Sequence, residues 1–304
     1  MTGLGPARAA AARIGALASR LVLDVGGRMG PRPGERRFPG RPQPSGLELE
    51  AHTPYAPGDD LRHLDWNLLG RFDTLLMRRF TAERELVVHL LVDASASMSA
   101  PAGDRKYAIA GELALGLAAI ALASRHAVRL VVLRGDGSAR ATVVHRRRPG
   151  LVAMADLLDA TVPAGAIALG AMLGEYAHRH PEGGAAIVVS DFLLEADELE
   201  PGVAALRRRG YATALLRVLG RGEVDPSRVL ATGELEDVET GLRHAVTLHA
   251  DTLARYGELF AAHEGRLQAS AVRQRAAWAG LVSDEPVDTF VTRDLVRLGL
   301  VRPR

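Results

Sequence analysis

The stretch that most constrains the fold is residues 86–98, where an apolar, β-branched run ends in an aspartate and two alternating serines. A run of this kind, bounded by polar residues, is typical of a buried strand. Asp93, Ser95 and Ser97 would then stand at the carboxyl end of that strand, which is where open α/β sheets place their ligands. We therefore expect a central strand that delivers oxygen donors to one edge of a sheet.

Strands and helices alternate along the rest of the chain, which predicts an α/β fold with a mainly parallel central sheet flanked by helices. Further strands are expected at 75–80, 128–133, 140–145, 185–189, 211–219 and 279–282, and helices at 104–125, 150–159, 169–178, 199–209, 251–275 and 286–298. Residues 128–133 and 140–145 should pair as a hairpin. The alternation of polar and apolar residues around Thr240 and Gly241 suggests a second, inserted β-hairpin at about 222–248.

The chain divides into three predicted parts. Residues 1–45 form an N-terminal extension, with an amphipathic helix at 7–23 and a basic arm rich in glycine and proline from 26. This arm is either a docking segment for an acidic partner or a solvated linker. Residues 46–85 hold a charged loop and a short strand, and residues 86–304 hold the α/β domain.

Several classes of protein are excluded by composition. The chain has no cysteine, so disulfides, thiol catalysis and cysteine-ligated zinc are absent. The basic residues exceed the acidic ones by only two, and all but Lys106 are arginines, so the high isoelectric point does not indicate a strong positive field. No secretory signal and no apolar stretch long enough to span a bilayer are visible, which predicts a soluble cytoplasmic protein.

The oxygen donors predict a metal site. Asp93, Ser95 and Ser97 alternate, so their side chains should point to one side, and Asp191 follows the expected strand at 185–189. Hard oxygen donors suit Mg²⁺ or Mn²⁺. The alternative is that these aspartates and serines cap the amide groups of the helix that follows.

The sequence also resembles a known family. Residues 90–98 resemble the metal-ion-dependent adhesion site of von Willebrand factor A-type domains. With residues 55–62, 65–67 and 79–85 added, the chain is similar to the bacterial family called domain of unknown function fifty-eight, from about residue 46 to its end. The resemblance implies a Rossmann-like von Willebrand factor A-type fold. It also implies partnership with MoxR-type AAA+ ATPases and with other von Willebrand A-domain proteins.

The resemblance assigns the site residue by residue. Asp93, Ser95 and Ser97 match the first metal-binding loop, and Asp191 matches the third. The second loop departs from the family pattern, because Ile167 stands where a threonine ligand is expected and Thr161 lies six residues earlier. An isoleucine supplies no oxygen, so metal binding should be weakened, mediated by water or lost.

A second candidate surface lies in the charged loop before the central strand. Its core is Asp59, Asp60, Arg62, Asp65 and Trp66. These residues either build a partner-binding surface or form an internal salt-bridge network.

The function predicted from these patterns is a non-enzymatic interaction adaptor that acts with a MoxR-type ATPase in a chaperone-like or complex-maturation role. The alternative is a magnesium-dependent phosphohydrolase with Asp93 as nucleophile. Against it, Ser95 stands where phosphatases of the haloacid dehalogenase type need a second aspartate, and no phosphate-binding loop is found.

The remaining sequence patterns give little indication of function. Arginine clusters at 28–41 and 146–148 lack interleaved aromatics, so no specific nucleic acid is expected. His178, His180, His244 and His249 have no carboxylate companions at metal spacing and are interpreted as surface histidines.

Overall fold

The structure is a computed structural model. It describes residues 18–24, 47–55, 64–72, 74–82, 86–228 and 232–304. Two compact units make up the chain: Met1–Phe38 with Leu86–Arg304, and Pro39–Glu85. Most of the predicted N-terminal helix and the whole basic arm lie outside the described residues.

The larger unit is built on a six-stranded sheet with the order β11-β8-β7-β4-β5-β6. Its strands are β4 (Val87–Ala94), β5 (Ala127–Arg134), β6 (Ala139–Ala141), β7 (Gly184–Ser190), β8 (Tyr211–Leu219) and β11 (Ala277–Val282). All neighbours are parallel except β5 and β6. Because β5 lies on one side of β4 and β7 on the other, the strand order reverses between β4 and β7. Such a reversal opens a crevice at the carboxyl ends of the two strands.

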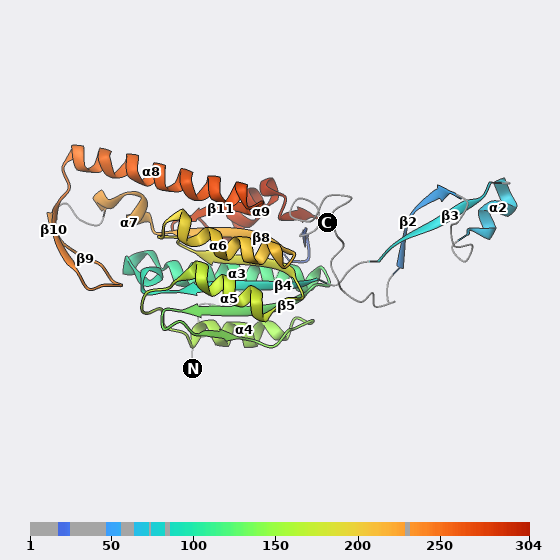
Figure 1. Ribbon diagram of the computed structural model, residues 1–304, viewed down its shortest axis with the longest axis horizontal. Coiled ribbons are helices and arrows are strands. Elements are labelled where there is room, and N and C mark those ends of the chain that lie inside the picture. Colours follow the sequence, from blue (N-terminus) through green and yellow to red (C-terminus); the bar gives the residue numbers. More distant parts are fainter. Residues whose placement is uncertain (1–17, 25–46, 56–63, 73, 83–85, 229–231) are drawn as a thin grey trace. The chain divides into compact units, whose positions relative to one another are not determined.

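Helices cover both faces of this sheet (Figure 1). One face is covered by α3 (Lys106–Ala123), α4 (Gly150–Asp159) and α9 (Val287–Leu298). The other is covered by α5 (Leu169–Arg179), α6 (Ala196–Arg208) and α8 (Ala250–Arg273). Along β4, Leu90 and Val92 face the first layer and Leu91 the second, which is the period-two alternation of a strand buried on both sides.

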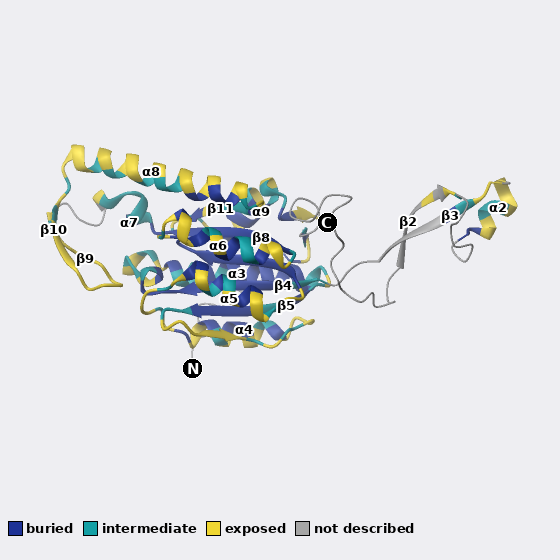
Figure 2. Cartoon of the chain, in the orientation of Figure 1, coloured by how far each residue is buried: buried dark blue, intermediate teal, exposed yellow. Residues whose placement is uncertain are grey.

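Burial follows these layers closely (Figure 2). The middle strands are buried over almost their whole length, whereas most of α8 is exposed and only Leu267, Ser270 and Ala271 on it are buried. The apolar run that starts at residue 86 therefore becomes a fully enclosed central strand, as its composition predicts.

Short elements complete the larger unit. They are β1 (Leu21–Leu23) and β12 (Val301–Pro303), the 3-10 turns η2 (Ala96–Ser99), η3 (Ala102–Asp104) and η4 (Pro226–Arg228), α7 (Arg221–Val224), and the strands β9 (Thr232–Glu236) and β10 (Arg243–Thr247). We call β9, β10 and the turn between them the ribbon. Within the part of the chain that the structure describes, the ribbon strands pair only with each other, in antiparallel fashion.

The smaller unit contains β2 (Leu47–Pro54), α2 (Trp66–Phe72) and β3 (Leu76–Ala82). The two strands pair in antiparallel fashion. The strand predicted at 75–80 matches most of β3, whereas the prediction of a loop for the β2 region is wrong. Apolar and polar residues alternate from Leu47 to Ala51, which is the pattern of a strand.

The prediction of a mixed α/β fold with a mostly parallel, helix-flanked sheet is confirmed. One prediction is wrong at its end: residues 21–23 are not helical but form β1, because Leu21, Val22 and Leu23 pair with the C-terminal strand β12. This pairing joins the two ends of the described chain, and local periodicity does not report it.

One helix of the described chain, Ala102–Ala123, is long and apolar enough to cross a membrane. Most of this segment is buried inside the unit, between the sheet and its neighbouring helices. Packing in a protein core accounts for its composition.

Two glycines allow α5 and α6 to pack closely. A Cβ added at Gly170 would lie 1.8 Å from the carbonyl oxygen of Glu198, and one at Gly202 would lie 2.3 Å from the carbonyl oxygen of Gly170. Both contacts are with backbone atoms, which cannot rotate away. Gly174, one turn further along α5, has no atom within 4 Å of such a Cβ.

This difference gives a prediction. Gly170→Ala should destabilise the protein by about 1–3 kcal/mol, because the helices must separate. Gly174→Ala should be neutral or stabilising by up to about 1 kcal/mol, because alanine favours a helix interior. The free energies of unfolding in urea measure both, and equal effects of the two substitutions would contradict the close packing.

Candidate functional site

The site predicted from the sequence lies at the carboxyl edge of the sheet, where the strand order reverses. β4 ends next to Asp93 and β7 ends next to Asp191, and these strands are hydrogen-bonded neighbours. The hydroxyl of Ser190, the last residue of β7, donates to Oδ2 of Asp93 over 2.6 Å. Two segments almost a hundred residues apart in sequence thus meet in one crevice.

The first predicted loop is tightly ordered. Oδ1 of Asp93 accepts the backbone N–H of Ser95 over 2.8 Å, and the hydroxyl oxygens of Ser95 and Ser97 lie 2.9 Å apart. Asp93 and Ser95 are buried, and Ser97 is half-buried. The structure therefore brings together the residues that the alternating pattern predicts to share one side.

Burial raises the pKa of Asp93, and the carboxylate of Asp191 raises it further. Hydrogen bonds from Ser190 and Ser95 act in the opposite direction. Both oxygens of Asp93 are thus occupied by donors of the protein itself, in a buried place with a second carboxylate nearby.

The second predicted loop lies beside the first but offers it no side-chain oxygen. The N–H of Ala96 donates to the carbonyl of Gly165, and the N–H of Ala164 donates to the carbonyl of Ala94. Ile167 packs against the core on the α5 side of the sheet. Thr161, which lies just after α4, donates its hydroxyl to the carbonyl of Leu157 on that helix, over 2.8 Å.

Lys106 is a site residue that is not among the predicted ones. Its side chain is completely buried, and Nζ lies 2.8 Å from Oδ2 of Asp191 and 2.5 Å from Oε1 of Glu223. Glu223 comes from α7, and its Oε2 accepts the N–H of Gly220 over 2.7 Å. Burial raises the pKa of Glu223, and the charge of Lys106 opposes that rise. One feature of the sequence could have pointed to Lys106: it is the only lysine in a chain whose other basic residues are arginines, apart from histidines.

A second buried cation, Arg217 near the end of β8, supports the same edge. Its Nε donates to the backbone carbonyl of Asp191 over 3.2 Å, and its NH1 atom lies 3.0 Å from Oε2 of Glu264. The guanidinium also lies over the ring of Phe260, 5.1 Å from the centroid. Glu264 and Phe260 are on α8, so this long helix is joined to the crevice through Arg217.

Glu239, on the turn of the ribbon, interacts electrostatically with the carboxylates at this edge. Partial burial raises the pKa of Glu239, and the carboxylates of Asp191, Asp237 and Asp93 raise it further, while a hydrogen bond with Ser97 lowers it. Figure 1 shows α7 and the ribbon at the end of the larger unit toward which the parallel strands run.

The expected Mg²⁺ or Mn²⁺ stays a prediction, and the side chains as arranged do not fit it. Magnesium prefers six oxygen ligands in near-octahedral geometry. Here Asp191 holds Lys106, both oxygens of Asp93 accept hydrogen bonds from the protein, and Ile167 supplies no oxygen. Among the described residues, no group of three or more His, Cys, Asp or Glu side chains is arranged to hold a metal ion.

The second candidate surface is only partly described, since Asp59, Asp60 and Arg62 lie outside the described residues. Asp65 is buried, and its Oδ1 accepts the N–H groups of Asn67 and Leu68 at the start of α2. Its Oδ2 lies 2.9 Å from Nε2 of His52. Asp65 therefore acts within its own unit as a helix cap, whereas Trp66 is 64% exposed.

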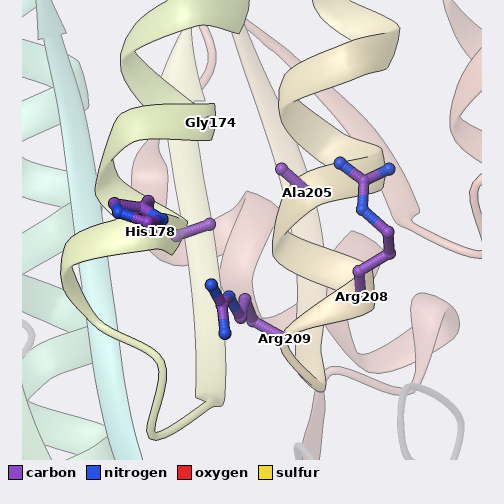
Figure 3. Close-up of a pocket in the computed structure, with 6 residues that line it drawn as sticks. Gly174, His178, Ala205, Arg208 and Arg209 are labelled. Atoms are coloured by element: carbon purple, nitrogen blue, oxygen red, sulfur yellow. The ribbon is translucent and has the colours of Figure 1, made fainter.

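A pocket lies at the opposite edge of the sheet (Figure 3). It has a volume of about 370 Å³ between the C-terminal ends of α5 and α6, and its lining includes His178, Arg208 and Arg209. It contains none of the predicted site residues. The arginines end α6 before Gly210, whose φ of +83° stops the helix as the sequence predicts.

Comparison with known protein families shows the family of this chain. A family profile described as "protein of unknown function DUF58" matches residues 52–266, more than half of the chain. The chain belongs to the DUF58 family. This confirms the family resemblance that the motifs before and after the central strand carry.

Three relatives are uncharacterized proteins, one of Mycobacterium bovis and two of strains of Mycobacterium tuberculosis. Each is 30% identical over 224 residues, which cover 69% of this DUF58 chain and 66% of the relative. The match thus spans slightly less than two thirds of the length of these proteins.

Two solved structures show weak likeness. The conserved hypothetical protein BatB of Bacteroides thetaiotaomicron has a TM-score of 0.43 at 13% identity, covering 70% of this chain and 98% of its own. An aerotolerance-related membrane protein of Bacteroides fragilis has a TM-score of 0.35 at 15% identity, covering 60% of this chain and 99% of its own. Likeness at this level does not bear on function.

A histidine cluster near the start of β4 is the other buried polar group of this strand. Nδ1 of His89 lies 2.6 Å from the hydroxyl of Tyr176, and the rings of Tyr211 and His180 pack around it. Burial, and then His180 and Arg129, lower the pKa of His89 to about 3. His180 is half-buried in this cluster, so its interpretation as a surface histidine is wrong, whereas His178 is exposed.

The low pKa of His89 predicts a pH dependence of stability. The unfolded chain binds a proton near pH 6.5 that the folded chain refuses until about pH 3, so stability is full above pH 6.5 and falls as the pH decreases toward 3. His89→Gln should remove this contribution, on the order of 4 kcal/mol. Urea unfolding of the wild type and the variant across this range measures it.

The matched control is His178→Gln, which changes an exposed histidine on the neighbouring helix α5 and should keep the wild-type pH dependence. An unchanged pH dependence in His89→Gln would show that other groups cause the loss of stability in acid.

Proposed function

We propose that this DUF58 protein is a non-enzymatic interaction adaptor that binds its partner at the carboxyl edge of the central sheet. The observation that carries the proposal is the self-contained network at this edge. Asp93, Asp191, Lys106 and Glu223 are held by one another, by Ser190 and by backbone amides, so this buried network fixes the loops that surround the edge. Rigid scaffolds with exposed loops around such an edge are typical of recognition sites.

The segments that border the crevice also offer apolar contact area. Leu193, two residues after Asp191, is 49% exposed, and Val238 and Leu242 on the turn of the ribbon are 46% and 60% exposed. Single exposed apolar residues are ordinary on protein surfaces, but their gathering on segments around one charged site supports a protein-binding role.

The partner that we propose is a MoxR-type AAA+ ATPase, in a chaperone-like or complex-maturation role, with other von Willebrand A-domain proteins as further partners. We propose further that the sheet is of the von Willebrand factor A type with the ribbon as its inserted hairpin. The reversal of strand order beside Asp93 and the Asp-x-Ser-x-Ser spacing after the first parallel strand support this assignment. We also propose that the protein acts in the cytoplasm.

The alternative of a phosphohydrolase with Asp93 as nucleophile has less support. A nucleophilic carboxylate needs a free oxygen near the substrate. Asp93 is 2% exposed, and both of its oxygens accept hydrogen bonds.

The adaptor proposal predicts where binding is lost. The double variant Val238→Asp/Leu242→Asp should bind a purified MoxR-type ATPase from the same organism at least about tenfold more weakly, because it places charges in the apolar part of the interface. Biolayer interferometry with the immobilised ATPase measures the dissociation constants.

The matched control is Val152→Asp, which places the same charge at a residue of α4 that is 54% exposed and distant in the fold from the ribbon. It should bind as the wild type does. Equal binding by all variants would remove the ribbon from the interface, and turnover of a phosphomonoester that Asp93→Asn abolishes would favour the enzyme instead.

A further inference from the structure

The cation at the carboxyl edge is part of the chain. The ammonium of Lys106 bridges two carboxylates from different elements, Asp191 after β7 and Glu223 on α7. Its side chain has no exposed surface, and those of Asp191 and Glu223 are 3% and 15% exposed. An unpaired ammonium in such a place would carry a large desolvation penalty, so the two carboxylates are what keep it there.

The position of Lys106 in its helix points the same way. It is the first residue of α3, where the free N–H groups of the helix give a partial positive charge that disfavours a cation. Lys106 at this end of α3 is therefore stabilised by the carboxylates of Asp191 and Glu223 and not by the helix. Lysine also differs from the arginines used in the rest of the chain, because its ammonium is a compact point charge.

Glu223 is held on both sides so that it faces Lys106. Its second oxygen accepts the N–H of Gly220, and the N–H of Gly222 donates to Oδ2 of Asp104 over 2.9 Å. A Cβ at Gly220 would approach that same oxygen of Asp104 to 2.4 Å, so this turn is tightly packed. The hydroxyl of Tyr256 on α8 donates to the backbone carbonyl of Glu223. The third carboxylate of the site is thus a built feature of α7.

We propose that Lys106 takes the place of the divalent ion at this edge. Its ammonium joins Asp191 to Glu223, and a metal ion beside it would face a like charge while having to displace hydrogen bonds already made by Asp93. The site that we assign to the adaptor function then works without a metal ion. One consequence, that a chelator does not change partner binding, rests on the proposed adaptor function.

The test uses the full chain without any partner. Free Mn²⁺ is followed by electron paramagnetic resonance while the protein is titrated with millimolar Mn²⁺. The wild type should leave the Mn²⁺ signal unchanged. Lys106→Met, which leaves the carboxylates without their cation, should bind Mn²⁺ at least about tenfold more tightly than the wild type. Asp93→Asn or Asp191→Asn in the Lys106→Met background should remove this gain.

The matched control is Arg105→Met, which removes a positive charge from the adjacent, exposed residue and should not create a Mn²⁺ site. If Lys106→Met does not fold, Lys106→Met/Glu223→Gln reduces the excess negative charge and replaces it in the titration.

A measurement of thermal stability also tests the proposal. The thermal unfolding midpoint should be the same in Mg²⁺ and in a chelator. Stoichiometric Mn²⁺ binding by the wild type would overturn the proposal. So would a rise of the wild-type midpoint in Mg²⁺ that disappears in Asp93→Ala and persists in Lys106→Met. Failure to bind the ATPase would remove the adaptor function and leave the role of Lys106 intact.

Discussion

The ion pair between Lys106 and Asp191 is the interaction on which the functional edge depends. It joins the first residue of α3 to the end of β7, and through Glu223 it also fixes α7. Removing one partner of a buried pair is costly, about 3–5 kcal/mol, because the other charge is left without compensation. Loss of any one of the three charges would therefore destabilise this edge.

The apolar sheet makes this arrangement possible. Val88, Leu90 and Val92 on one face and Leu91 on the other are fully buried, so β4 is enclosed by helices and its first polar residues after the apolar run emerge only at its carboxyl end. Because β7 is parallel to β4, the same rule puts Asp191 at the same edge. Two like charges are thereby forced together, and a nearby cation must compensate them.

The sequence could be used to predict much of the fold because local signals are strong in its α/β part. The expected strand at 211–219 and helix at 150–159 coincide with β8 and α4, since apolar periodicity and turn residues mark their ends. The segment 21–23 was not predictable as a strand, because its pairing partner β12 lies at the other end of the chain. The β2 region was predictable, because its apolar and polar residues alternate from Leu47 to Ala51.

The candidate site was also predictable from the sequence only in part. Sequence by itself determined that Asp93, Ser95, Ser97 and Asp191 would meet, because each follows an apolar strand and parallel strands end at one edge. It also showed that Ile167 supplies no oxygen. Only the tertiary structure decided which cation compensates the carboxylates, since Lys106 opens a helix and Glu223 lies 117 residues further along the chain. Compensation of buried charge depends on distance in space, and no spacing along the sequence encodes it.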